Sequence, residues 1–283
     1  MVNISLIRQS NNQIDESSVP RVAVFVGGTS GIGKITLADI AGLGIGFKAY
    51  VIGRKESEQS FKPFLEELHQ AKPNANVIWV EGQVSLLSEV KRVCLDVSHS
   101  LNFYSRICFV ENLLPLLRAS GNARVISVYS GGIESERRLD INDLNLEKPG
   151  AFGAIATQMH MGIMGTLTLE RLAEMKENHS IVFIPNYSGI VRTGNLFRGW
   201  EEGSWGPWMA AIFFDPILML FAYSFKESAE RHLYQVTSEL TGGLFLVNRK
   251  CDTVMNEKEL AKLRVTARET VWAKAYQIIG PYI

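Results

Sequence analysis

The sequence predicts a doubly wound α/β fold, in which helices flank a parallel β-sheet, and three observations lead to this prediction. The apolar run 22–26 is rich in β-branched residues, as expected of a buried parallel strand. A turn with four glycines follows this run, and apolar residues then recur at helical spacing over 34–43. Two further apolar runs, 46–54 and 76–81, enclose an amphipathic stretch at 60–71, which repeats the strand–helix–strand order.

The glycine turn has the pattern Gly-x-x-x-Gly-x-Gly and is suited to bind an anion. The backbone N–H groups of a first helical turn and the positive end of the helix dipole point at a bound phosphate. Glycine is needed where a Cβ would keep the backbone away from a pyrophosphate. The candidate cofactor-binding residues of this turn are Gly27, Thr29, Ser30, Gly31, Ile32 and Gly33.

This turn resembles the cofactor loop of the short-chain dehydrogenase/reductase family, T-G-x-x-x-G-x-G, with Val26 where the family usually has Thr. The resemblance covers roughly residues 20–250 and implies a Rossmann-type fold. In such folds a carboxylate after the second strand binds the ribose 2′-hydroxyl of NAD, whereas a cation accommodates the 2′-phosphate of NADP. Arg54 follows this strand and no acid stands at its tip, so NADP is the predicted cofactor. Gln83 replaces the family's adenine-binding Asp, and its side-chain amide can accept the same hydrogen bond.

The interval between Gln83 and the helix expected over 103–117 is too short for the family pattern. It contains no N-N-A-G turn, and on the order of 30 residues are missing from it. In the family, these residues form the fourth strand, at the centre of the sheet. We therefore expect a sheet whose central fourth strand is missing or replaced, with 92–97 as a candidate replacement. A truncated gene model and a real deletion explain the gap equally well.

The chain rejoins the family pattern in a strand predicted over 123–128, and Ser130 takes the place of the catalytic Ser that ends this strand in the family. The family's Tyr-x-x-x-Lys pair should follow on a helix, where the Tyr protonates the carbonyl oxygen and the Lys lowers its pKa. Alignment on 167–173 places Gln158 and Gly162 at these two positions, and a register anchored on the preceding loop places Phe152 and Ala156 there. Since no Tyr or Lys lies between 148 and 176, the usual acid is absent in any register.

Three other side chains are candidates for the missing proton donor. His160 is the titratable side chain of this helix nearest the expected site, and an imidazole can donate a proton near neutral pH. The alternative is a structural role for His160 at the wall of the pocket. Tyr104 and Tyr129, on neighbouring elements, are weaker substitutes.

The segment after the strand predicted at 180–185 resembles the family's P-G-x-V-x-T loop, which contacts the nicotinamide amide. The resemblance assigns this contact to Ile190, Val191 and Thr193. A hydrophobic lid over the substrate is expected at about 195–225, where the very apolar run 205–225 is interrupted by Asp215-Pro216. Peripheral membrane contact through 205–225 is the alternative, and a spanning helix is the least favoured interpretation.

Composition limits the other functions and partners. The chain has 29 basic and 29 acidic residues, so it shows no charge excess that would attract nucleic acid. Its three cysteines are far apart, which argues against disulfides and a metal site and favours the cytoplasm, with membrane association as the alternative. We expect a flexible leader over 1–20 and a single domain over 21–283, which ends in an amphipathic helical tail at 257–279. The resemblance also implies a homodimer or homotetramer.

The predicted function is that of an NADP-dependent oxidoreductase acting on a carbonyl or hydroxyl of a small lipophilic metabolite. The tail and the lid resemble fungal members of the family that act in polyketide or terpenoid pathways. Two alternatives remain because the Tyr/Lys pair is absent. They are a non-redox isomerase or cyclase descended from this family, and a catalytically inactive protein of the same fold.

Overall fold

The computed structural model describes residues 2–82, 103–129, 131–151, 153–189, 191, 222–254 and 256–283. The chain divides into two compact units, and each unit is assembled from two separate stretches of sequence. The amino-terminal unit contains 2–82 and 189–238, and the carboxy-terminal unit contains 83–188 and 239–283. Among the predictions that lie outside the described residues are the replacement strand at 92–97 and most of the lid.

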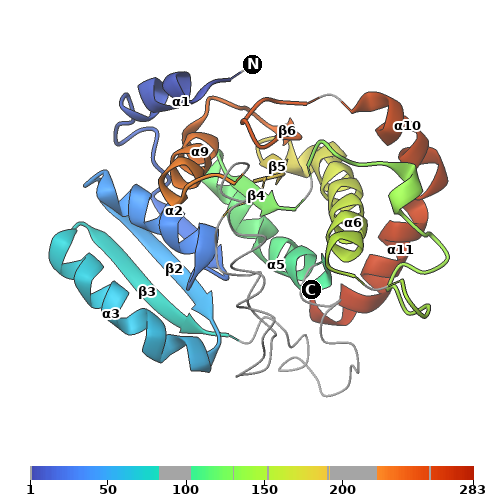
Figure 1. Ribbon diagram of the computed structural model, residues 1–283, viewed down its shortest axis with the longest axis horizontal. Helices are drawn as coiled ribbons and strands as arrows, with labels where there is room; N and C mark the ends of the chain where they lie inside the picture. The colour runs from blue at the N-terminus through green and yellow to red at the C-terminus, as the bar shows by residue number, and fades with distance from the viewer. Residues whose placement is uncertain are drawn as a thin grey trace. The chain divides into compact units, whose positions relative to one another are not determined.

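The amino-terminal unit contains a three-stranded parallel sheet in the order β1-β2-β3 (Figure 1). Its strands are β1 (Val22–Val26), β2 (Phe47–Gly53) and β3 (Ala75–Glu81). Helices α2 (Gly31–Gly42) and α3 (Lys55–Ala71) connect the strands. Alternate residues of β2 are buried, and they pack with apolar residues of α2 and α3 in one core. The strand–helix–strand order predicted from the sequence is confirmed here.

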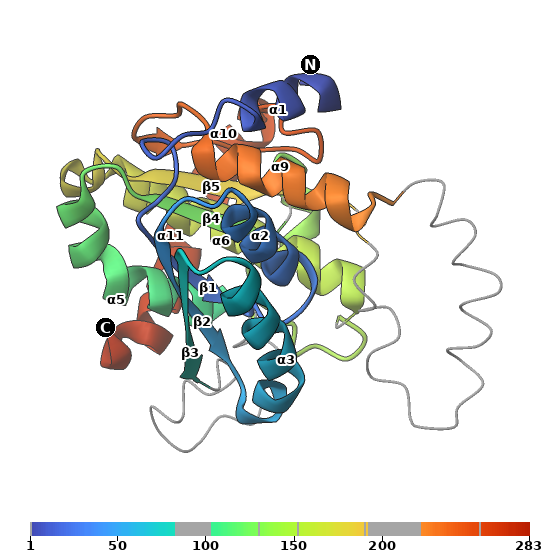
Figure 2. The same ribbon diagram turned by 90° about the vertical axis from the view of Figure 1, so that its left-hand side faces the viewer.

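The first 20 residues are not the flexible leader that their polarity predicts. Helix α1 (Ile4–Asn11) lies beside α9 (Phe225–Thr237), as Figure 2 shows. The Ile7 side chain is fully buried, and Arg8 Nε lies 3.0 Å from Glu230 Oε2. Asn3 caps the helix by accepting a hydrogen bond of 2.9 Å from the backbone N–H of Leu6. A cap and one well-buried Ile thus order a segment whose composition favours disorder.

The carboxy-terminal unit contains a second parallel sheet, in the order β4-β5-β6. Its strands are β4 (Arg124–Val128), β5 (Val182–Asn186) and β6 (Gly243–Leu244). Its α-helices are α5 (Ser105–Ser120), α6 (Ala154–Glu174), α10 (Glu257–Thr266) and α11 (Arg268–Ile279). Among its described residues are also three short 3₁₀ helices, η2 (Glu136–Arg138), η3 (Lys176–Asn178) and η5 (Gly280–Tyr282). All five residues of β5 are buried, as expected of a strand covered on both faces.

Parallel strands and flanking helices confirm the predicted fold class. Within the described residues, β1 pairs with β2 alone and β4 with β5 alone, so the expected central strand is not among the elements described. The tail predicted as one helix over 257–279 is two helices that meet at Ala267, whose φ of −134° departs from helical geometry. Ala267 is buried at this junction, so packing in the core accompanies a bend that no Gly or Pro signals.

Candidate functional site

The glycine turn leads from β1 into α2 with the backbone geometry that its sequence predicts. Gly27 and Gly31 have φ angles of +80° and +58°, in the left-handed region that other residues rarely adopt. A Cβ on Gly33 would lie 2.9 Å from Cα of Gly28, so the start of α2 packs directly against the turn. The N–H of Gly27 donates a hydrogen bond of 3.2 Å to the carbonyl of Ile52, which fixes the turn to the end of β2.

The amino-terminal end of α2 is suited to an anion. Ser30 occupies the N-cap position, yet its side chain forms no capping hydrogen bond, and the first turn of α2 contains no acidic residue. The ammonium of Lys34 lies 4.4 Å from the centre of the Phe64 ring on α3, so a cation is held in this first turn. The helix dipole is therefore not offset by a carboxylate of the helix itself.

Arg54 is placed where a 2′-phosphate would need a cation. It is exposed, directly follows Gly53 at the end of β2, and no acid stands at the tip of this strand. A Cβ on Gly53 would lie 2.6 Å from Cγ2 of Thr29, so the glycine turn and the end of β2 are in contact. The structure thus brings Thr29 and the residue before Arg54 together within one unit, as the resemblance requires.

Most other predicted cofactor contacts cannot be placed. Gln83, Ile190, Thr193 and the predicted catalytic Ser130 lie outside the described residues. Val191 forms an isolated parallel β-bridge with Tyr223. The roles assigned to all these residues stay predictions.

In the carboxy-terminal unit, Gln158 of α6 lies at the end of β4. Its Nε2 donates a hydrogen bond of 3.4 Å to the carbonyl of Tyr129, the residue before Ser130. The Tyr129 ring packs against α6 where Gly165 leaves room for it, and the Arg106 guanidinium lies 4.3 Å from the ring centre. Burial raises the pKa of Tyr129 to about 12, although Arg106 opposes this shift. The residue aligned with the family's acid therefore presents an amide at the strand end.

His160 lies on a different face of α6. It follows Gln158 by two residues, which is about 200° around the helix. His160 is buried and lies near Asp140, whose pKa is lowered by hydrogen bonds from Lys148 and from the backbone N–H of Asn142 and, to a smaller extent, by His160. This position favours a structural role for His160, and its catalytic role stays a prediction.

Tyr104 forms a hydrogen bond with another side chain of the carboxy-terminal unit. Its hydroxyl donates a hydrogen bond of 2.7 Å to Asn145 Oδ1, and burial raises its pKa. A buried, bonded phenol of this kind is suited to packing rather than to proton transfer.

Glu134 is a buried carboxyl that the sequence did not single out. Its Oε1 accepts hydrogen bonds from Thr166 Oγ1 at 2.9 Å and from the N–H of Gly132 at 3.1 Å. Among the described residues, Oε2 has no hydrogen-bond partner, and burial raises the pKa of this carboxyl. A Glu that follows two glycines and precedes Ser and Glu is typical of an exposed turn, so no signal in the sequence points to its burial.

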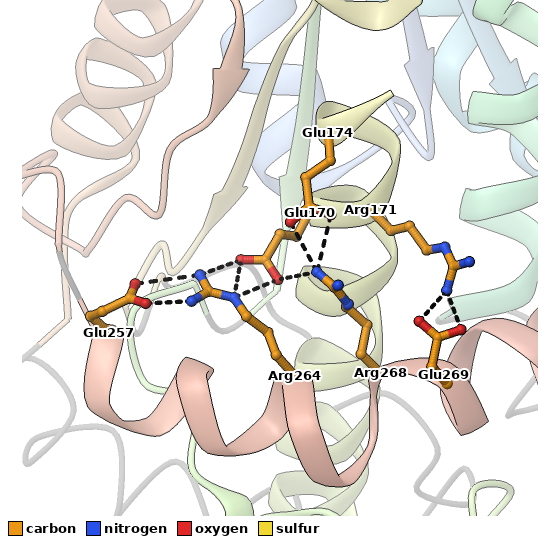
Figure 3. A network of polar contacts seen from close by, with 7 residues as sticks. All are labelled: Glu170, Arg171, Glu174, Glu257, Arg264, Arg268 and Glu269. Atoms are coloured by element: carbon orange, nitrogen blue, oxygen red, sulfur yellow. Dashed lines mark hydrogen bonds and ion pairs between the residues drawn. The ribbon is translucent and has the colours of Figure 1, made fainter. Parts of the chain in front are cut away.

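A network of ion pairs fastens α10 and α11 to the carboxy-terminal half of α6 (Figure 3). Arg264 Nη2 lies 2.7 Å from Glu170 Oε1, and the Glu170 side chain is only 7% exposed. Arg268 pairs with Glu174 at 2.9 Å. Four carboxylates and three guanidiniums share these contacts, namely Glu170, Glu174, Glu257, Glu269, Arg171, Arg264 and Arg268. The helix that should carry the acid is therefore firmly held, even though the acid is absent.

Several fungal oxidoreductases are similar to this chain in sequence, although no family model matches it. Oxidoreductase AN1596 of Emericella nidulans is 32% identical, over 84% of this chain and 78% of that protein. The NmrA-like family domain-containing oxidoreductase notO of Aspergillus sp. (strain MF297-2) is 31% identical, over 93% of this chain and 90% of that protein. The short-chain dehydrogenase/reductase SAT2 of Stachybotrys chartarum is 27% identical over 68% of this chain. The alignment with notO runs over 304 positions, more than the 283 residues of this chain, so notO carries residues that this chain lacks.

Solved structures support the same fold. L-sorbose reductase from Gluconobacter frateurii matches with a TM-score of 0.53 at 15% identity, over 86% of this chain and 100% of that one. YwfH, a reductase involved in bacilysin biosynthesis, matches with a TM-score of 0.52, over 83% and 99% of the two chains. No helix among the described residues has the length and apolar character needed to cross a membrane. From the glycine turn, the parallel sheets and the fungal relatives, we conclude that this chain belongs to the short-chain dehydrogenase/reductase-like family of fungal oxidoreductases.

Proposed function

We propose that this protein is an NADP-dependent oxidoreductase that acts on a carbonyl or hydroxyl group of a small lipophilic metabolite in a specialised-metabolite pathway. The observation that carries the proposal is the contact between the glycine turn and the end of β2, which places Thr29 beside the Gly53–Arg54 step. Structural neighbours support the cofactor, because L-sorbose reductase is described in complex with NADPH and YwfH as NADPH-dependent.

The residues present fit this cofactor. The turn around Gly27 and Gly31 and the uncapped start of α2 suit a pyrophosphate, and Arg54 suits a 2′-phosphate. Ile190, Val191 and Thr193 are proposed to contact the nicotinamide amide, and Gln83 the adenine. When bound, NADP exchanges a hydride with the substrate carbon. The protein must bind and orient both molecules and must move a proton to or from the substrate oxygen.

The proton donor must differ from that of the family. Gln158 has an amide that cannot release a proton at working pH, so Ser130 and His160 are the proposed participants. We expect His160→Ala to lower turnover 100-fold or more with NADPH affinity unchanged, because the substitution removes the proposed acid. A loss of less than twofold would instead assign His160 the structural role that its position, about 200° from Gln158 around α6, favours.

The first test is a fluorescence titration of the purified protein with NADPH and with NADH. We expect saturable binding of NADPH and at least tenfold weaker binding of NADH, because only NADPH presents a phosphate to Arg54. Failure of a folded sample to bind either cofactor would overturn the proposal. If NADPH binds, its oxidation is then followed with a panel of lipophilic ketones and aldehydes.

A second function, favoured by Gln158 at the position of the family's Tyr, is a non-redox isomerase or cyclase. An enzyme of this kind would convert its substrate by positioning and by one acid such as His160, and it would leave bound NADPH unoxidised. An inactive binding protein would bind NADPH without any conversion of substrate. Following NADPH absorbance and substrate consumption in the same sample separates the three cases. Light scattering and vesicle sedimentation test the proposed homodimer or homotetramer and the alternative of peripheral membrane contact.

A further inference from the structure

We infer that Trp79 on β3 is a positioning residue that sets the preference for NADPH over NADH, because its indole holds Thr29 and the Gly53–Arg54 step in place. This inference rests on the proposed function, since it concerns how that cofactor is selected. Trp79 lies within β3, outside the glycine turn, and no sequence motif assigns it a role.

The main observation behind this inference is that there is no space for a side chain at Gly53. A Cβ on this residue would lie 2.7 Å from Cζ3 of Trp79 and 2.6 Å from Cγ2 of Thr29. Carbon atoms in contact are normally about 3.5–4.0 Å apart, so no side chain fits there. The edge of the indole and the methyl group of Thr29 therefore fill the place that a side chain at 53 would take. Three elements meet at this point, namely the glycine turn, the end of β2 and β3.

The indole also packs with aromatic side chains of α3. Trp79 is the partner of Val51 in the sheet, and its ring centre lies 5.7 Å from that of Phe61. Phe61 in turn lies 5.3 Å from Phe64, the ring that carries the Lys34 ammonium. A rigid ring packed in this way cannot move aside without disturbing the first turn of α2.

A second observation marks the same side chain. Nε1 of Trp79 is buried and has no hydrogen-bond partner among the described residues, although an indole N–H can only donate. Buried donors of this kind are uncommon in folded proteins, and each calls for an explanation. Here the packing of the indole over Gly53 is accompanied by the loss of a hydrogen bond, as expected where the position of a ring matters more than the pairing of its N–H group.

Thr29 and Gly53, the two neighbours of the indole, link it to the selection of the cofactor. Thr29 is part of the phosphate-binding turn, and Gly53 directly precedes Arg54. The indole therefore fixes the spacing between the turn and the cation that would meet the 2′-phosphate. NADPH and NADH differ only in this phosphate, so a change in the spacing should affect NADPH far more than NADH.

The test is a double-mutant cycle on cofactor affinity with Gly53→Ala and Trp79→Leu. Each single variant is expected to weaken NADPH binding about tenfold and NADH binding less than twofold, because misplaced groups lose their contacts with the phosphate. In the double variant, removal of the indole relieves its clash with the new methyl group but leaves the clash with Thr29, so the losses in NADPH affinity should be less than additive. Thermal unfolding of each free protein shows whether it is folded.

Gly46→Ala is the matched control, since Gly46 precedes the opposite end of β2 and its Cβ would lie an ordinary 3.9 Å from the carbonyl oxygen of Asn74. This control should bind both cofactors as the wild type does. If Trp79→Leu is folded and keeps the wild-type ratio of NADPH to NADH affinity, the inference is wrong and Trp79 serves only in packing. If the wild type binds neither cofactor, both the proposed function and this inference are overturned. Should Gly53→Ala not fold, the affinity ratio of Trp79→Leu and of Trp79→Phe decides the question.

Discussion

The two units preserve the family's site to very different degrees. In the amino-terminal unit, the glycine turn, the start of α2 and the Gly53–Arg54 step have the geometry that the family resemblance implies. In the carboxy-terminal unit, the helix that should carry the Tyr and Lys is present and firmly held, yet Gln158 and Gly162 stand at those positions. One region has the backbone geometry that the resemblance implies, and the other has the helix but not the two side chains that the resemblance requires.

This difference follows from what each region is made of. A phosphate site built from backbone N–H groups depends on glycines and on a strand–turn–helix path, so its loss would disturb the fold itself. A proton donor is a single side chain, and one substitution removes it while the helix and its packing remain. Binding and catalysis can therefore change separately in such a protein. Substitutions made in one unit at a time test whether the two units are independent in this sense.

The largest expected effect is on cofactor binding in the amino-terminal unit. Gly33→Val places a Cβ 2.9 Å from Cα of Gly28, where the backbone has no room to move. We expect the affinity for NADPH to fall at least 100-fold, about 2.7 kcal/mol, while the carboxy-terminal unit stays folded. Isothermal titration measures the affinity, and near-ultraviolet circular dichroism monitors the aromatic packing.

Gly42→Ala is the control for this change, because a Cβ there meets nothing within 4 Å at the far end of the same helix. It should leave the affinity as it is and stabilise α2 by roughly 0.5 kcal/mol. Equal losses in the two variants would mean that the helix as a whole, and not the turn, governs binding.

The next effect is on stability in the carboxy-terminal unit. Arg264→Ala leaves the buried Glu170 with only Arg268, 3.8 Å away. We expect the free energy of unfolding to fall by about 2 kcal/mol, less than for a fully buried pair because the Arg264 side chain is 30% exposed. Denaturant titration measures this loss.

Affinity for NADPH should change less than twofold in Arg264→Ala if the two units act separately. Arg8→Ala is the matched control, since the Arg8 side chain is 52% exposed in its pair with Glu230. This substitution should lower the free energy of unfolding by only about 0–1 kcal/mol. A large fall in NADPH affinity with Arg264→Ala would show that the units are coupled and would refute the contrast drawn above.

The smallest effect concerns Glu134 and depends on pH. Burial raises the pKa of this carboxyl in the folded protein, so its contribution to stability is complete at acidic pH and declines as pH rises through the raised pKa. Glu134→Gln cannot ionise and should lack this decline, which makes the variant more stable at neutral pH by roughly 1 kcal/mol. Unfolding curves recorded from pH 4 to pH 9 measure how the free energy of unfolding changes with pH in the two proteins.

Asp143→Asn is the counterpart with the opposite sign. Burial opposes ionisation of Asp143, yet the backbone N–H groups of Lys148 and Glu147 outweigh it and lower the pKa of this carboxyl. Its contribution to stability is therefore lost as pH falls, and the Asn variant should be less stable at neutral pH. Identical pH profiles for the two variants would contradict both assignments.

The sequence predicted the elements of the fold well because most of them have strong periodicity. The strands β1, β2 and β3 and the helix α5 lie within a few residues of the predicted ranges. Helix α1 was missed because the polar composition of the first 20 residues favours disorder, although the segment is amphipathic and buries Ile7. The break at Ala267 was missed because it follows packing and not a Gly or Pro.

The candidate site was predicted where it depends on local sequence and missed where it depends on register. The glycine turn and Arg54 are local motifs, so they could be recognised directly. The contact of Trp79 with Gly53 depends on the alignment of β3 with β2, which no motif encodes. The burial of Glu134 depends on Thr166, which is 32 residues away. Pairings over such distances are set by the tertiary fold and not by any local pattern.

The way each unit is assembled from two stretches has a consequence for synthesis of the protein. Helix α9, which packs on α1 and α2, is translated long after both of them, and α10 and α11, which hold α6, come last of all. The amino-terminal unit therefore cannot complete its core before about residue 238 is made, and the carboxy-terminal unit cannot do so before the last helices are made. Closure over such long sequence separations is slow. A premature stop near residue 238 would leave the first unit whole and deprive the second of its final stretch, and no single cut in the chain yields two complete halves.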